Sequence, residues 1–308
     1  MAEITAKTVA ELREKSGAGM MDCKKALTEA GGDIDAAMDY LRKKGIASAA
    51  KKAGRAAAQG LVCSMTDDKS GIVLELNSET DFVAQNAEFQ TFLAEVSKIA
   101  LAKKTDLEGT KKEKLASTGK SVEDSLTDMI AKIGENMNLR RMARIEVENG
   151  VVVSYVHNEA SKGQGKIGVL IALESKADKE KLKELGKQLA MHAAATSPQS
   201  LSIEAMDPAV VEKEKEIFRE QAKASGKPDN IIDKMIEGRV RKFYEESVFL
   251  EQVFVIDGET KVKDVIAKAA KDLGEKIELK AFFRFGLGEG VEKKEVDFAA
   301  EVAEQLKK

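Results

Sequence analysis

The chain has 308 residues, of which 43% are hydrophobic, 33% are charged and 5% are aromatic. This balance is typical of a folded chain long enough for two or more domains, and it excludes a largely disordered protein. The formal net charge is -3, so the chain as a whole has no basic field that would hold nucleic acid or an anionic membrane.

The N-terminal segment, residues 1–55, predicts a small bundle of three helices. The expected helix starts are a capping box at Thr8–Glu11 and N-caps at Asp22 and Asp33. Gly17 and Gly19 are expected to end the first helix, with Met20 and Met21 in the turn that follows. Three helices in about 40 residues bury little surface alone, so we expect an interaction domain attached to a larger body.

The next stretch, Arg42 to Gly60, is rich in Ala, Gly and Lys and has no acidic residue. A basic stretch of this kind would support a nucleic-acid-binding or ribosome-associated protein. It contains no aromatic residue on which bases could stack, however, and this argues against such a patch. A solvated basic helix or a linker is the favoured interpretation.

From Gly60 onward the chain repeats itself. The matching segments are 60–65 with 150–155, 71–76 with 168–173, and 133–140 with 273–280. The first two pairs are typical of strands, and the third leads in each copy into a strand that contains Arg144 or Arg284. Each copy therefore contains a hairpin, helical sequence and a closing strand. This order predicts a duplicated α+β core with antiparallel sheets and helices on one face.

The second copy carries an insertion at 198–245 that predicts a helical hairpin. Asp207 and Pro208 are typical of a helix start, and residues 225–227 are typical of a helix stop before a second helix. The apolar seam of this hairpin can be satisfied internally or can pair with a partner. The pattern does not decide between these two interpretations.

A search for catalytic chemistry finds no pattern in this sequence. There is no metal-ligand spacing, no Gly-x-Ser-x-Gly nucleophile motif and no Gly-x-x-x-x-Gly-Lys-Ser/Thr phosphate loop. The segment Gly163–Gly168 fits the letters of a dinucleotide fingerprint, but it opens a strand rather than a helix, so we interpret it as a hairpin turn. We therefore expect no catalytic residue, no metal and no cofactor.

The two histidines have different interpretations. His157 lies directly after a predicted strand, where a surface role and a binding contact both fit. His192 lies in a helical segment, and we expect it to be partly buried with a structural role.

The loop after the second strand of the first copy differs from its counterpart. Both copies have an acidic residue at the matching point, Asp81 and Asp178, which fits helix capping. Only the first copy places Phe82 and Val83 directly after it. The pair can fold under the following helix beside its phenylalanines, or it can offer an aromatic wedge and a carboxylate to a partner. The pattern alone favours packing.

Several motifs, in the same order over nearly the whole chain, resemble the bacterial elongation factor Ts family. The segments that carry the resemblance are 17–27, 77–83, 132–136, 190–194, 288–290 and 297–302. Members of this family are nucleotide exchange factors in translation elongation, which agrees with the missing catalytic pattern. The resemblance implies a protein that is not an enzyme, that binds GDP-bound elongation factor Tu and that does not contact nucleic acid directly.

The resemblance also implies roles for individual residues. The loop that would enter elongation factor Tu and dislodge its Mg²⁺ consists of Thr80, Asp81, Phe82 and Val83. Phe82 would act as the wedge, and Asp81 would disturb the arrangement that holds the ion. Further partner-binding residues would be Met20, Met21 and His157. The helical hairpin would match the dimerisation element of the family, so a homodimer through it is a further expectation.

The same resemblance suggests a division of the chain into five parts. They are a ubiquitin-associated-like helical domain (1–55), core subdomain N (56–146), core subdomain C (147–197 with 246–286), the hairpin (198–245) and a C-terminal module (287–308). The sequence contains no run of about 18 apolar residues, so we expect no membrane span. Cys23 and Cys63 lie far apart and suit a reducing compartment, so we expect a cytoplasmic protein.

Overall fold

A computed structural model describes residues 4–223 and 228–291 of the chain. Within them the chain forms two compact units. Unit 1 contains the chain up to Leu61, the segment Leu74–Arg141 and the segment that begins at Gly286. Unit 2 contains Val62–Val73 and Met142–Phe285. The division into five parts stays a prediction.

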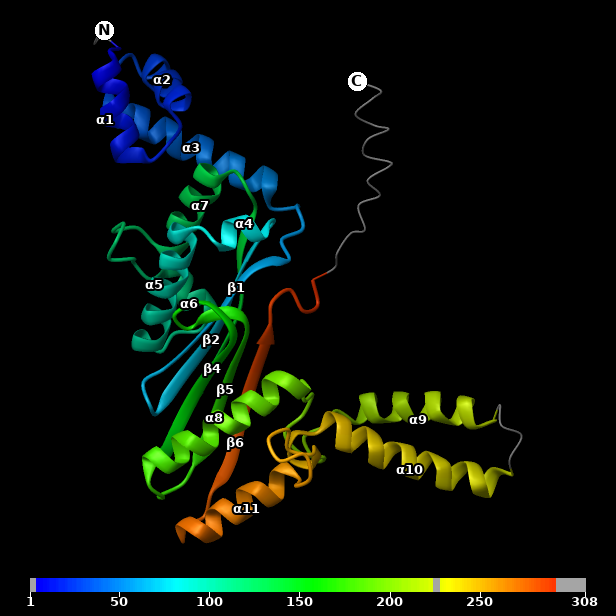
Figure 1. Ribbon diagram of the computed structural model, residues 1–308. Coiled ribbons are helices and arrows are strands. Elements are labelled where there is room, and N and C mark those ends of the chain that lie inside the picture. Colours follow the sequence, from blue (N-terminus) through cyan, green and yellow to red (C-terminus); the bar gives the residue numbers. More distant parts are fainter. Residues whose placement is uncertain (1–3, 224–227, 292–308) are drawn as a thin grey trace. The chain divides into compact units, whose positions relative to one another are not determined.

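Unit 1 begins with a bundle of α1 (Ala6–Ser16), α2 (Met20–Glu29) and α3 (Ile34–Lys52), as Figure 1 shows. Its core consists of small and medium apolar side chains: Val9, Leu12, Cys23, Ala26, Leu27 and Ala37. Gly17 ends α1 in the left-handed conformation, with φ at 67°, where a residue without Cβ is favoured. The predicted three-helix bundle is confirmed.

Two of the three predicted helix starts are wrong by a few residues. The first helix is capped by Thr5, because its hydroxyl accepts the Thr8 N–H at 3.2 Å and the Thr8 hydroxyl accepts the Thr5 N–H at 3.0 Å. The second helix follows the extended backbone of Gly19, so Asp22 lies in its first turn rather than at the cap. The third start is confirmed, since the Asp33 carboxylate accepts a backbone N–H of α3.

Among the described residues, six strands form one sheet. They are β1 (Gln59–Thr66), β2 (Ser70–Ser78), β3 (Met137–Glu146), β4 (Gly150–Ser161), β5 (Gln164–Glu174) and β6 (Glu278–Gly286). The strand order is β3-β2-β1-β5-β4, and β6 also pairs with β5. β5 is antiparallel to both β4 and β1, with Val62 opposite Gly165. Strands from both copies of the repeat lie in this sheet, which confirms the α+β fold.

The glycine-rich segment 163–168 is a turn and the start of a strand, as predicted. Gly163 has φ at 72° in the turn between β4 and β5. A Cβ at Gly165 would lie 2.6 Å from the Val156 side chain, and a Cβ at Gly168 would lie 2.6 Å from Val62. These glycines therefore serve close packing within the sheet, and the dinucleotide interpretation is excluded by the strand that they open.

In its described residues, unit 1 also contains the helices α4 (Asp81–Ala84), α5 (Ala87–Lys103), α6 (Leu107–Lys112) and α7 (Val122–Ile133). The side chains that α5 buries are Phe89, Phe92, Leu93, Val96, Ser97 and Ala100. They recur at helical spacing, so α5 presents one apolar face to the core of the unit. All nine residues of β2 are buried as well.

The basic stretch lies mostly in α3 and packs on α7. A Cβ added at Gly45 would lie 3.4 Å from the Cβ of Ala131, so the small residue permits the close approach of the two helices. Arg42 also pairs with Asp124 at 3.6 Å. The linker interpretation is therefore wrong for residues 42–52, and the alternative of a basic helix is confirmed.

The segment after β6 is held by a buried carboxylate. Glu75 of β2 has no exposed surface, and both of its oxygens accept hydrogen bonds from Arg140 and Arg141 of β3. The backbone N–H of Gly288 donates to the same carboxylate at 2.9 Å. The start of the predicted C-terminal module is thus attached to unit 1, while residues 292–308 lie outside the described part of the chain.

Unit 2 carries the helices α8 (Lys179–Thr196), α9 (Pro208–Lys223), α10 (Asp229–Ser247) and α11 (Val262–Leu273), and the short 3₁₀ helix η1 (Phe249–Glu251). Its main core joins β4 and β5 to α8, η1 and α11, and includes Val151, Ile171, Leu173, Leu182, Leu189, Phe249 and Val262. The predicted helical sequence of the second copy is confirmed.

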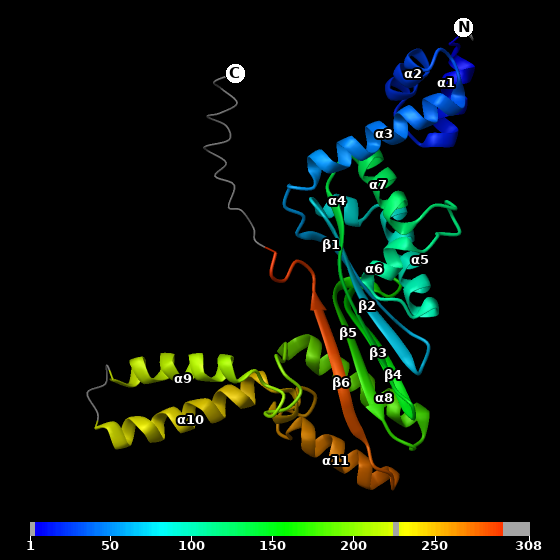
Figure 2. The same cartoon turned by 180° about the vertical axis from the view of Figure 1, so that it is seen from behind.

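The insertion forms a hairpin of α9 and α10, which lie side by side in Figures 1 and 2. Its seam buries Ala222, Ile232 and Ile236, and a second cluster contains Met206, Val211 and Val248. Part of the seam is therefore satisfied within the hairpin, whereas Ile217 and Ile231 are 38% and 42% exposed. The predicted helix stop at 225–227 lies outside the described residues.

His192 of α8 is fully buried and stacks on Phe249, with ring centroids 5.4 Å apart. Its Nδ1 accepts the backbone N–H of Val255 at 3.2 Å, so the hydrogen is on Nε2, which donates to Gln252 Oε1 at 2.9 Å. Burial lowers the pKa of His192, and the bond to Gln252 opposes this only in part. The structural role predicted for His192 is confirmed, although its burial is complete rather than partial.

We predict that His192 makes the fold weaker in mild acid. Because the pKa of the folded state lies below the unfolded value of about 6.5, the unfolded chain binds a proton that the folded chain excludes. The free energy of unfolding should therefore fall as the pH drops from about 7 to about 5, by up to about 1.4 kcal/mol per pH unit from this group. Urea unfolding across this range measures the slope.

His192→Gln should reduce that slope. The control is His157→Gln, since the chain has only two histidines and His157 is exposed. An unchanged slope in His192→Gln would contradict the prediction.

Candidate functional site

The described residues contain no site for a metal and no membrane helix. No group of three or more His, Cys, Asp or Glu side chains in this part of the chain is placed to hold a metal ion. Every described helix is also too short or too polar to cross a bilayer.

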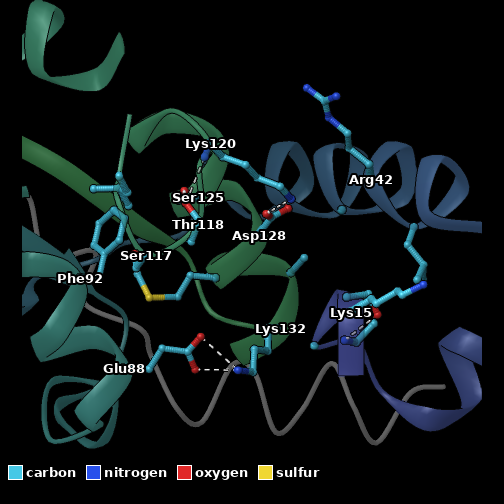
Figure 3. A pocket seen from close by; sticks show the side chains of 18 of the residues that line it. Lys15, Arg42, Glu88, Phe92, Ser117, Thr118, Lys120, Ser125, Asp128 and Lys132 are labelled. Atoms are coloured by element: carbon cyan, nitrogen blue, oxygen red, sulfur yellow. Dashed lines mark hydrogen bonds and ion pairs between the residues drawn. The ribbon is translucent and has the colours of Figure 1, made fainter. Parts of the chain in front are cut away.

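A pocket of about 880 Å³ lies among α3, α5 and α7. The charged groups around it pair with one another, as the dashed lines in Figure 3 show for Glu88 with Lys132 and for Lys120 with Asp128. Arg42 on its rim is likewise paired with Asp124. A ligand site would present charged or polar groups that lack a protein partner. The described charged groups at this pocket all have partners within the protein, so we do not assign a ligand to it.

The loop between β2 and α5 has a different character, because it exposes a large aromatic side chain. Phe82 is 78% exposed, whereas the adjacent Val83 and Ala84 are only 6% and 8% exposed. Packing of Phe82 under the following helix, which the sequence pattern alone favoured, is therefore wrong. Packing is confirmed for Val83. Val83 therefore anchors the loop in the core, and Phe82 faces solvent.

Local hydrogen bonds explain why the loop takes this shape. The Ser78 hydroxyl donates to the Thr80 carbonyl at 2.8 Å. The backbone then makes the single turn of α4, and the N–H groups of Gln85 and Asn86 donate to the carbonyls of Phe82 and Val83. The Asn86 side chain caps α5 by accepting the Glu88 N–H at 2.8 Å. Residues on both sides of Phe82 are thus fixed by short-range bonds.

Asp81 is not the helix cap that its repeat counterpart is. Asp178 accepts the Lys181 N–H at 3.0 Å and caps α8. Asp81 is instead the first residue of α4, after the N-cap Thr80, and the helix has no side-chain cap bond. Its carboxylate is exposed and makes no hydrogen bond or ion pair with residues 4–223 or 228–291. A charged group without an internal partner stands next to the exposed phenylalanine.

Two residues without a role in the sequence-based predictions connect this loop to the turn after α7. The Glu135 carboxylate accepts the Thr80 N–H at 3.0 Å and the Thr80 hydroxyl at 2.7 Å. The Glu79 carboxylate accepts the N–H of Asn136. The available signal was the segment 133–140, which matches 273–280 in the repeat and part of which carries the family resemblance, although neither comparison assigned a role to Glu135.

The other predicted contact residues are exposed as well. Met20 and Met21 are 60% and 76% exposed in the first turn of α2, rather than in the turn before it. His157 is exposed within β4, opposite Ile167, and its Nδ1 lies 3.1 Å from the Tyr155 hydroxyl. The expected position of His157 after the strand is wrong, because β4 continues to Ser161. The structure brings the methionines and the loop into unit 1, and it places His157 in unit 2.

The chain is similar to proteins of one family. The family model described as elongation factor TS matches residues 79–289. A protein named elongation factor Ts from Rhodospirillum rubrum is 59% identical over 309 residues, which cover 100% of both chains. Proteins of the same name from Rhodospirillum centenum and Rhizobium etli are 55% and 53% identical. These matches cover 98% and 100% of this chain, and 99% and 100% of the two relatives.

We predict that the two apolar residues of the loop differ in how much they contribute to stability. Val83→Ala should lower the free energy of unfolding by about 1–3 kcal/mol, because it removes buried methyl groups. Phe82→Ala should change it by less than about 0.5 kcal/mol, because most of that side chain is already in water. Urea unfolding followed by circular dichroism measures both variants. A larger loss for Phe82→Ala than for Val83→Ala would show that the loop is packed differently.

Proposed function

The chain belongs to the elongation factor Ts family, and from this premise we propose that it binds GDP-bound elongation factor Tu and accelerates the release of GDP. The observation that carries the proposal is Phe82, a large aromatic side chain that is 78% exposed on a loop with a fixed backbone. Exposed aromatic residues of this kind are the usual anchors of protein interfaces. The loop thus offers a preorganised wedge to a partner.

The proposed mechanism acts on the metal site of the partner. Phe82 enters elongation factor Tu beside its Mg²⁺ site, and the Asp81 carboxylate disturbs the groups that hold the ion. Mg²⁺ requires nearly ideal octahedral oxygen ligands, so a small displacement of its surroundings weakens its binding. Without the ion, the charge of the bound diphosphate is less well compensated and GDP dissociates faster.

The roles of the four loop residues follow from their positions. Thr80 joins the loop to the body of unit 1 through Glu135, and Val83 anchors it in the core. Asp81 and Phe82 are the residues that reach the partner. In this proposal no residue of the chain is catalytic, because an exchange factor alters an affinity rather than a covalent bond. By linkage, bound GDP must weaken the grip of the exchange factor by the same factor.

Other surfaces extend the proposed complex. Exposed methionines adapt well to partner surfaces, so Met20 and Met21 add contacts to the GTPase domain of elongation factor Tu. His157 contacts another domain of that partner. We propose further that the hairpin of α9 and α10 supports a homodimer, that the chain makes no direct contact with nucleic acid and that it acts in the cytoplasm.

We predict that Phe82→Ala slows nucleotide exchange. The release of a fluorescent GDP analogue from elongation factor Tu should fall roughly 10- to 100-fold at a fixed concentration of the variant, since a truncated anchor typically costs that much. Stopped-flow fluorescence measures this rate. The control is Ile256→Ala, which removes a 50% exposed side chain in unit 2. Unchanged release with Phe82→Ala would refute the wedge, and no acceleration by the unmodified chain would refute the proposed function.

We also predict that the double substitution Met20→Ser, Met21→Ser weakens binding to elongation factor Tu without changing the rate at which the complex releases GDP. The concentration of the chain that gives half-maximal GDP release should rise about tenfold, while the maximal release rate should change by less than about twofold. A titration of elongation factor Tu with each variant measures both quantities. Met191→Ser is the matched control, because Met191 is 40% exposed but lies in α8. Equal effects of the two sets of substitutions would contradict the assigned contact.

A further inference from the structure

We propose that Glu79 and Glu135 form a clamp that holds the loop in the conformation that exposes Phe82, and that Glu135 is the positioning residue of this clamp. The inference rests on the proposed exchange function, because it assigns a role in presenting Phe82 to a partner. Neither residue reaches that partner in this proposal. They act on the loop alone.

The contacts of the clamp are reciprocal. Glu135, in the turn after α7, accepts the N–H and the hydroxyl of Thr80 at 3.0 and 2.7 Å. Glu79, in the loop, accepts the N–H of Asn136 in that same turn. Each segment therefore supplies a carboxylate to the backbone of the other. Hydrogen bonds to charged acceptors are stronger than neutral ones, so the clamp fixes the backbone two residues before Phe82.

The segment that follows α3 completes the clamp. The Arg55 guanidinium lies 3.4 Å from the Glu79 carboxylate, and the Asn136 side-chain amide donates to the Arg55 carbonyl at 2.7 Å. The Arg55 cation therefore compensates the negative charge of the Glu79 carboxylate. The last cation of the basic stretch thus has a role inside unit 1.

The position of Glu135 is unfavourable for the helix that precedes it. It directly follows Gly134, the left-handed C-cap of α7. The C-terminal end of a helix carries partial negative charge, so an acidic side chain there is destabilising unless something else binds it. The two donors of Thr80 supply that binding. The arrangement therefore favours a role for Glu135 in the loop rather than in the helix.

The second copy of the repeat has a glutamate at the position that matches Glu135, but it lacks the loop with Phe82. Gly274 and Glu275 follow α11 as Gly134 and Glu135 follow α7, and Gly274 is also a left-handed C-cap. The Glu275 side chain is exposed and makes no hydrogen bond or ion pair within the described part of the chain. The motif alone is therefore compatible with the fold in the absence of a clamp, and only the copy with Phe82 uses it.

The clamp adds to the short-range bonds of the loop, because an exposed phenylalanine on a less restrained loop would turn inward. Burial of apolar surface is favourable, and a loop without fixed ends samples conformations in which Phe82 packs on the protein. Val83 anchors the loop after Phe82, and the clamp holds it before Phe82. Because the clamp holds Phe82 outward before binding, less conformational entropy is lost when the partner binds.

The first test measures the clamp in the full chain without a partner. In Glu135→Ala the amide hydrogen of Thr80 should exchange with solvent at least about tenfold faster, because its acceptor is removed. Hydrogen exchange followed by NMR measures this rate, and thermal melts show whether the variant is folded. The matched control Glu275→Ala should leave the Thr80 rate unchanged. Continued protection of Thr80 in Glu135→Ala would overturn the clamp, and this test does not depend on exchange activity.

The second test measures the consequence for GDP release from elongation factor Tu. Glu135→Ala should lower the maximal release rate by about tenfold and change the half-saturating concentration by less than about twofold. Thr80→Val, which removes the hydroxyl, should show a smaller effect in the same direction. Glu135→Gln, which retains an acceptor, should recover part of the rate.

A double-mutant comparison separates positioning of Phe82 from general damage. If Glu135 acts by presenting Phe82, Glu135→Ala should have almost no further effect in a Phe82→Ala background. Fully multiplicative effects would overturn the proposal, as would an equal loss in Glu275→Ala. If the unmodified chain does not accelerate GDP release, the proposed function fails, and the Thr80 exchange rates still decide whether the clamp exists.

Discussion

The organisation of unit 1 depends on one buried carboxylate. Glu75 lies in the middle of β2, where every residue is buried, and a buried charge is tolerated only when it is paired. Arg140 and Arg141 supply this pairing from β3, and the N–H of Gly288 adds a bond from the segment after β6. One group therefore connects the strand that leads into the loop, its neighbour in the sheet and the start of the C-terminal segment.

The exposed side chain of the loop depends on this buried framework. Asn77 donates to Glu75 at 2.9 Å and to the Gln59 carbonyl at 3.2 Å, so the end of β2 is fixed just before the loop begins. The backbone leaves the sheet at Ser78, and Val83 returns to the core. Phe82 lies between these two attachments and faces solvent. The exposure of Phe82 is therefore a consequence of how the two ends of the loop are buried.

The two copies of the repeat differ in the segment that follows their second strand. Both use a glycine C-cap followed by a glutamate, and both contribute strands to the same sheet. The second copy uses Asp178 to cap a long helix that packs on its strands. The first copy replaces this direct entry with the single turn of α4 and its exposed residues. The difference is confined to a few residues after β2, and the fold of both copies is retained because it depends on the strands and their buried faces.

The sequence by itself determined the helical bundle, the repeat, the strands and the hairpin, because these follow from local periodicity and from glycine, proline and capping residues. It also indicated the loop at Phe82, but it favoured packing of that side chain. Only the tertiary structure decided that Phe82 faces solvent, that Asp81 lacks an internal partner and that Glu135 binds Thr80. The bonds between Glu135 and Thr80 join residues 55 positions apart, and the direction of a side chain after a strand depends on which apolar surface the rest of the chain can bury.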